Sequence, residues 1–128
     1  MGEKCEYVLG KGDHGSTYGG NPICAAAALN VISRLDDALF SGVKTREDVI
    51  RTELSSLEGV ETITGMGLMI GIKTTAPAAD VVRECMNRGV LCLTAKDKVR
   101  LLPALNIPMD DLEYAIETIK AVAKELAK

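Results

Sequence analysis

A short segment of the 128-residue chain, residues 14–22, combines the groups best suited to bind a small anion. Ser16 and Thr17 offer two adjacent hydroxyl groups, and a glycine pair, Gly19 and Gly20, follows after one residue. Hydroxyls and backbone N–H groups at the start of a helix are good ligands for a phosphate or carboxylate. Glycines let the backbone approach such a ligand closely. The same composition suits a tight turn before a capped helix, and neither a P-loop nor a dinucleotide-binding pattern is present.

The four cysteines do not form a recognisable metal-binding pattern. Cys5, Cys24, Cys85 and Cys92 lack the CxxC spacing of zinc sites, and the chain has only one histidine to add. Free cysteine is among the residue types most often buried. We therefore expect reduced and mostly buried thiols.

Composition favours a single soluble domain and excludes two classes of partner. Hydrophobic residues make up 47% of the chain and charged residues 26%, as in ordinary globular proteins. A net charge of −3 with 3% aromatic residues gives neither the basic patch nor the stacking surface of a nucleic-acid-binding protein. No apolar run approaches the ~20 residues of a membrane span, and the amino terminus lacks a signal peptide's apolar region. We expect a cytoplasmic protein.

The anion-binding segment precedes a helix that is apolar on nearly every face. Asn21 is a favourable N-cap residue, and Pro22 suits the first helical position. The helix is predicted to run to about Leu35, and apolar residues surround it. A helix of this kind is buried by other protein. The helical pattern of apolar residues weakens over residues 36–44, and Gly42 is predicted to break any helix there.

Helices and strands alternate over the rest of the chain. Thr45 and Asp48 resemble a capping box for a helix that ends near residue 56. Periodicity predicts strands over 60–64, 68–73, 90–94 and 99–102, and helices over 78–88 and 109–127. The expected fold is an α/β (α+β) domain, whose sheet of three to four mostly antiparallel strands is covered by helices.

The order of residues in four segments resembles the class III aminotransferases, a family that uses pyridoxal 5′-phosphate. Residues 12–22, GDHGSTYGGNP, are similar to the family's HGST-aromatic-GGNP signature. The family's later motifs resemble GMGLMIG at 65–71, RGVL at 88–91 and VRLLP at 99–103. The resemblance covers essentially the whole chain and extends through four segments in the same order.

This resemblance implies a carboxy-terminal portion of a fold-type I enzyme. Residues 1–21 would form an active-site and dimer-interface loop that belongs to the large domain. Residues 22–38 would form an interdomain helix, and residues 39–128 the small α/β domain. The full-length protein would be a homodimer that acts on amino acids and 2-oxo acids.

The resemblance also assigns roles to individual residues. Thr17 would bind the cofactor phosphate of the partner subunit, and Ser16 would lie beside the substrate or cofactor. The turn and helix cap would be formed by Gly19, Gly20 and Asn21.

Two further side chains have matches in the family. Arg100 matches an arginine that binds a substrate carboxylate or pairs with an acidic residue, and the alternative is a solvent-exposed strand charge. His14 matches a position that does not transfer protons in the family, so we interpret it as structural.

The family's cofactor-binding lysine is expected to precede this chain. The segment Thr94-Ala95-Lys96 superficially resembles the lysine motif, but it follows the HGST signature instead of preceding it. The adjacent charges of Asp97 and Lys98 are typical of an exposed turn. We therefore expect no catalytic residue in this chain, no transaminase activity from the chain alone, and no retained cofactor.

The form of the motifs favours the acetylornithine group of the family. Its members transfer the terminal amino group of N-acetylornithine to 2-oxoglutarate in arginine biosynthesis. Ornithine, 4-aminobutyrate and succinyl-diaminopimelate remain alternative substrates. A free-standing, non-catalytic α/β binding module is a further alternative, although an apolar helix would then stay uncovered.

Overall fold

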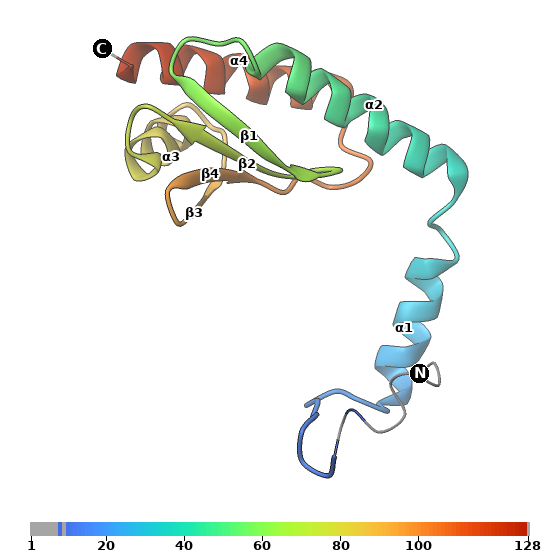
Figure 1. The fold of residues 1–128 in the computed structure, drawn as a ribbon. Coiled ribbons are helices and arrows are strands. Elements are labelled where there is room, and N and C mark those ends of the chain that lie inside the picture. Colours follow the sequence, from blue (N-terminus) through green and yellow to red (C-terminus); the bar gives the residue numbers. More distant parts are fainter. Residues whose placement is uncertain (1–7, 9, 128) are drawn as a thin grey trace. The chain divides into compact units, whose positions relative to one another are not determined.

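The computed structural model describes residue 8 and residues 10–127, and it separates into two compact units (Figure 1). The first unit ends at Asp36, and the second begins at Asp37. No described helix is both long enough and apolar enough to cross a membrane.

The first unit consists of a loop followed by helix α1 (Pro22–Ile32). The helix ends three residues earlier than the sequence predicted. Backbone bonds of the i→i+3 type, from Arg34 N to Val31 O and from Leu35 N to Ile32 O, replace the α-helical pattern there. None of the side chains of α1 is buried by the described residues.

The second unit is an antiparallel sheet with three helices, as the sequence predicted. Its elements are α2 (Asp37–Leu54), β1 (Val60–Met66), β2 (Met69–Thr74), α3 (Ala78–Asn87), β3 (Leu93–Ala95), β4 (Lys98–Leu101) and α4 (Met109–Leu126). The strand order is β1-β2-β4-β3, and every neighbouring pair is antiparallel. The α+β class is thereby confirmed.

Helix α2 corrects two predictions from the sequence. It runs without a break through Gly42, and Thr45 lies inside it instead of capping its start. The Thr45 hydroxyl donates to Ser41 O at 3.1 Å, which is a bond within the helix. Arg46 compensates for the weak helix propensity of Gly42, because its Nη1 donates to Gly42 O and its Nε to Ile107 O.

One face of the sheet carries the core, and the other stays open. Along β2 the side chains of Ile70, Ile72 and Thr74 are buried, while Met69 is exposed. The residues that fill the core come from the sheet and all three helices; the largest fully buried ones are Ile50, Leu54, Ile70, Ile72, Val81, Cys85, Val99, Ile116, Ile119 and Val122. The resulting layer of helices on a single sheet face is a standard way to bury an antiparallel sheet.

Strand β3 begins later than the sequence predicted, at Leu93 instead of residue 90. Val90 cannot pair with a strand because its N–H donates to Cys85 O at 2.9 Å and so closes the end of α3. The short strand β3 pairs with β4 through Leu93↔Arg100, Thr94↔Val99 and Ala95↔Lys98.

Candidate functional site

The turn before α1 is held by Asn21. The Asn21 Oδ1 accepts from the N–H groups of Ile23 at 2.9 Å and Cys24 at 3.2 Å, so Asn21 is the N-cap residue. Its own N–H donates to Tyr18 O at 3.1 Å, which closes the turn. Gly20 lies within this turn at a φ of +74°. Local hydrogen bonds therefore fix the loop where it enters the helix.

This capping leaves the hydroxyls, and not the helix end, as the groups that can bind an anion. Pro22 has no N–H, and the next three N–H groups all donate to Asn21 oxygens. Ser16 and Thr17 are exposed, and neither hydroxyl bonds to another described residue. Gly19 follows closely, and a Cβ built there would lie 3.0 Å from the Ser16 Cβ. The two hydroxyls can thus donate to an external phosphate without adding charge.

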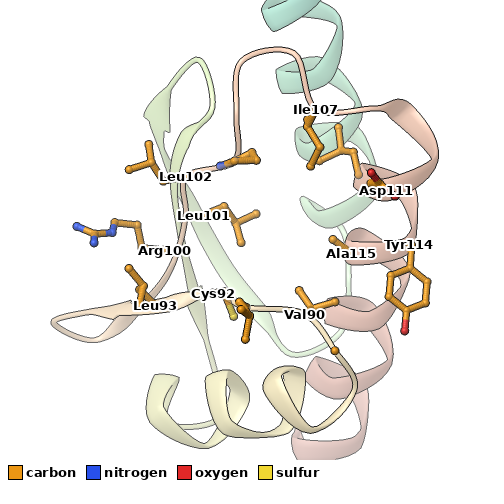
Figure 2. Close-up of a pocket in the computed structure, with 14 residues that line it drawn as sticks. Val90, Cys92, Leu93, Arg100, Leu101, Leu102, Ile107, Asp111, Tyr114 and Ala115 are labelled. Atoms are coloured by element: carbon orange, nitrogen blue, oxygen red, sulfur yellow. The ribbon is translucent and has the colours of Figure 1, made fainter.

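Arg100 lies in β4, between Gly71 of β2 and Leu93 of β3. Its side chain is half-buried and points away from α4, whereas the neighbouring Leu101 points toward that helix (Figure 2). The guanidinium group therefore lies on the open face of the sheet. Its Nε is buried and has no hydrogen-bond partner among the described residues.

Arg100 differs in this respect from the other cations on the open face. Lys73 pairs with Glu61 at 3.0 Å, and the hydrogen bond from Lys73 to Glu61 together with the Glu61 charge raises the lysine's pKa. The Lys98 Nζ donates to Thr64 Oγ1 at 2.9 Å. Within the described residues, Arg100 alone of these three has no side-chain partner. An unpaired, half-buried guanidinium is suited to bind a carboxylate from outside the chain.

The other arginines of the second unit all have hydrogen-bond or ion-pair partners among the described residues. Arg46 bonds to backbone carbonyls, and Arg51, Arg83 and Arg88 pair with carboxylates. Across the described part of the second unit, Arg100 is the one arginine for which no bond of either kind is found.

A pocket of about 390 Å³ lies between β4 and α4, and Arg100 is among the residues that line it (Figure 2). Its walls are mostly apolar and come from the segment after α3, from β4, and from α4, where Asp111 and Tyr114 stand. The Tyr114 hydroxyl donates to Arg88 O at 2.9 Å, which ties α4 to the end of α3. Cys92 also borders this pocket. Reasoning from the sequence did not find the pocket, since its walls come from several elements of residues 89–115 that meet only in the folded unit.

Two residues that the sequence raised as chemical candidates lie in exposed positions. His14 is exposed in the loop of the first unit. Lys96 is exposed in the β3–β4 turn and adopts a φ of +57°, as suits a turn residue. No cluster of metal-ligating side chains occurs within the part of the chain that the structure describes.

The candidate residues fall into two groups, one in each unit. Ser16, Thr17 and Asn21 belong to the first unit, and Arg100 belongs to the second. Neither group contains an acid–base pair or an activated nucleophile among the described residues, so the groups can bind and orient ligands but supply no reacting atom.

Comparison with known proteins identifies the family. The family model described as aminotransferase class-III matches residues 2–123. The chain belongs to the class III aminotransferases.

Class III relatives resemble the chain throughout, although the chain spans only about a third of their length. An acetylornithine aminotransferase from Haemophilus ducreyi is 41% identical over 128 residues, which cover 98% of this chain and 33% of that protein. The mitochondrial acetylornithine aminotransferase of Saccharomyces cerevisiae is 34% identical, covering 94% and 32%. The fold matches Plasmodium falciparum ornithine delta-aminotransferase with a TM-score of 0.74 at 27% identity, covering 94% of this chain and 34% of that one.

Proposed function

We propose that this chain is the carboxy-terminal third of an acetylornithine aminotransferase that uses pyridoxal 5′-phosphate. The full-length enzyme, a cytoplasmic homodimer, transfers the terminal amino group of N-acetylornithine to 2-oxoglutarate in arginine biosynthesis. Membership of the class III family and the acetylornithine aminotransferase relatives support the assignment. The observation that carries the chain's own part in it is the unpaired Arg100 on the open sheet face.

The chain's residues bind and orient in this proposal. Thr17 donates its hydroxyl to the cofactor phosphate in the partner subunit, and Ser16 lies beside the substrate or cofactor. The exposed hydroxyls fit a phosphate, because Asn21 already satisfies the helix end behind them. Arg100 binds the substrate carboxylate. The cofactor, when bound, supplies the electron sink for amino transfer.

The Arg100 role can be tested in the full-length enzyme with Arg100→Gln. Loss of a charge-assisted, two-point contact removes about 1.5–3 kcal/mol, so kcat/KM should fall roughly 10–100-fold for N-acetylornithine. The matched control is Arg83→Gln, which changes an exposed arginine paired within α3. An unchanged kcat/KM in the Arg100 variant would refute the carboxylate role.

The Thr17 role can be tested by cofactor binding. Thr17→Ala should raise the dissociation constant for pyridoxal 5′-phosphate about tenfold, the loss expected for one hydrogen bond to a charged group. Thr45→Ala is the matched control, because that hydroxyl bonds only within α2. Equal affinities in the two variants would contradict the assignment.

The substrate can be tested by kinetics and the fragment's activity by spectroscopy. The similarity to ornithine aminotransferases makes ornithine the second candidate substrate, and a higher kcat/KM for ornithine than for N-acetylornithine would favour it. We expect the chain alone to show no transaminase activity and no cofactor absorbance band, because in this proposal Lys96 is a turn residue and not the cofactor-binding lysine. A band that disappears in Lys96→Ala would overturn that expectation.

A further inference from the structure

Cys85 and Cys92 bring two free thiols together inside the second unit. Cys85 lies on α3 and is fully buried, and Cys92 precedes β3 and is 7% exposed. Their side chains share a hydrogen bond. Cys24, in contrast, is exposed on α1.

The end of α3 fixes this arrangement. The Gly89 N–H donates to Met86 O at 3.0 Å, and the Val90 N–H donates to Cys85 O at 2.9 Å. Together these bonds form a Schellman motif, in which Gly89 takes the left-handed conformation at a φ of +85°. The chain therefore turns back immediately after α3, and two residues later Cys92 lies beside Cys85. The sequence signal for the contact was the glycine between the two cysteines, which spacing rules for metal sites do not use.

The two thiols differ in acidity and access. The pKa of Cys92 is lowered, chiefly because Cys85 donates a hydrogen bond to its sulfur. The same hydrogen bond, followed by burial, raises the pKa of Cys85. Cys92 also borders the pocket of about 390 Å³, whereas Cys85 does not, and Cys92 is the more exposed of the two residues, at 7% against 0%. Cys92 is thus the nucleophile of the pair, since the thiolate is the reactive form of cysteine.

We propose that Cys85 and Cys92 form a reactive dithiol that small-molecule disulfides oxidise to an intramolecular disulfide. The Cys92 thiolate attacks one sulfur of the small disulfide, and the first small thiol leaves with a proton from solvent. Cys85 then gives up its proton to the solvent and attacks the Cys92 sulfur. The bond from Cys92 to the small molecule breaks, and the second small thiolate leaves and takes a proton from the solvent. The protein loses two hydrogen atoms, and the small disulfide is reduced to two thiols.

Mass spectrometry of the folded chain tests this site. The background variant Cys5→Ser/Cys24→Ser keeps only the pair, and 2-hydroxyethyl disulfide is the oxidant. The intact mass should fall by two hydrogen atoms. Trypsin cleaves after Arg83, Arg88 and Lys96, so the two cysteines fall on separate peptides, 84–88 and 89–96. These peptides should stay joined until a reductant is added.

Removing one thiol gives the matched control. In the same background, Cys85→Ala should leave a stable mixed disulfide on Cys92, because no second thiol resolves it. Circular dichroism should show that each variant is folded. If Cys85→Ala does not fold, the background protein is titrated with phenylarsine oxide instead, and this arsenical should bind once per chain. The proposal is overturned if the background protein also accumulates the mixed disulfide, if its thiols react only in urea, or if the arsenical does not bind.

Discussion

The two units of this protein treat apolar side chains in opposite ways. In the second unit Ile119 is completely buried, and residues from the sheet and three helices surround the same core. In the first unit Ile23 is 78% exposed, and no residue of α1 is buried by the described chain. Hydrophobic content alone therefore does not make a core. A segment acquires one only where an opposing apolar surface packs against it, and among the described residues only the second unit has such surfaces.

The largest expected effect tests this contrast directly. Ile119→Ala should lower the free energy of unfolding by about 2–5 kcal/mol, because it leaves a cavity in a filled core. Ile23→Ala makes the same change in α1 and should alter the unfolding free energy by less than about 0.5 kcal/mol. Urea denaturation followed by circular dichroism measures both. Equal effects would mean that α1 is buried after all.

The next effect concerns the tolerance of each unit for a single methyl group. In the β1–β2 hairpin Gly65 has a φ of +122°, and a Cβ at this position would clash with the backbone oxygen of Met69. Gly65→Ala should therefore cost roughly 2–3 kcal/mol of stability. Gly15 in the first unit has no atom within 4 Å of the place that a methyl group would take, so Gly15→Ala should leave the urea midpoint unchanged. A tolerated Gly65→Ala would show that the hairpin can shift.

A smaller effect should appear in the first unit alone. Asn21→Ala removes the side chain that caps α1, which costs about 1 kcal/mol of helix stability. Helical circular dichroism should fall slightly, while the cooperative unfolding of the second unit stays at the same urea concentration. If the midpoint falls as well, the two units unfold together.

The smallest expected effect is on the pH dependence of stability, and it comes from an ion pair on the surface of the second unit. Arg88 pairs with Glu84 at 2.9 Å and also contacts Glu125, which links α3 to α4. The hydrogen bond from Arg88, followed by one from Asn87, lowers the pKa of Glu84 from its ordinary value of 4.5. The contribution of Glu84 is therefore complete above pH 4.5 and is lost as the pH falls through the lowered value.

Arg88→Gln should accordingly flatten the acid side of the stability–pH curve, with a change smaller than that of the cap variant. Arg83→Gln serves as its control, since Arg83 pairs only within α3. An unchanged acid limb in the Arg88 variant would show that the pair contributes nothing to stability.

The sequence predicted the elements whose signals are local. The periodicity of α4 and the alternation in β1 indicate the correct elements, because each pattern depends on residues close together in the chain. Gly42 misled the prediction of α2 because its compensation comes from Arg46, which also bonds to Ile107 far along the chain. The start of β3 was placed too early for a similar reason, since Val90 is used to close α3.

The residues of the candidate site show the same distinction between local signals and the effects of distant residues. The order of residues in the loop singled out Ser16 and Thr17, and Arg100 came from the resemblance of a short strand motif. The surroundings of Arg100 could not be predicted. Its lack of a partner depends on the residues that the neighbouring strands place opposite it, Gly71 and Leu93, and neither of them has a charged side chain. Pairing of distant strands sets that environment, and a linear pattern does not contain it.

The strand order β1-β2-β4-β3 has a consequence for how the second unit assembles in time. Strands β1 and β2 join through a turn of two residues and can pair as soon as both exist. Helix α3 and strand β3 both lie between β2 and β4 in the chain. Pairing of β4 with β2 at the centre of the sheet therefore has to close a long loop. We expect the hairpin to form early and the β2–β4 seam to set the folding rate, since non-local pairing is intrinsically slow.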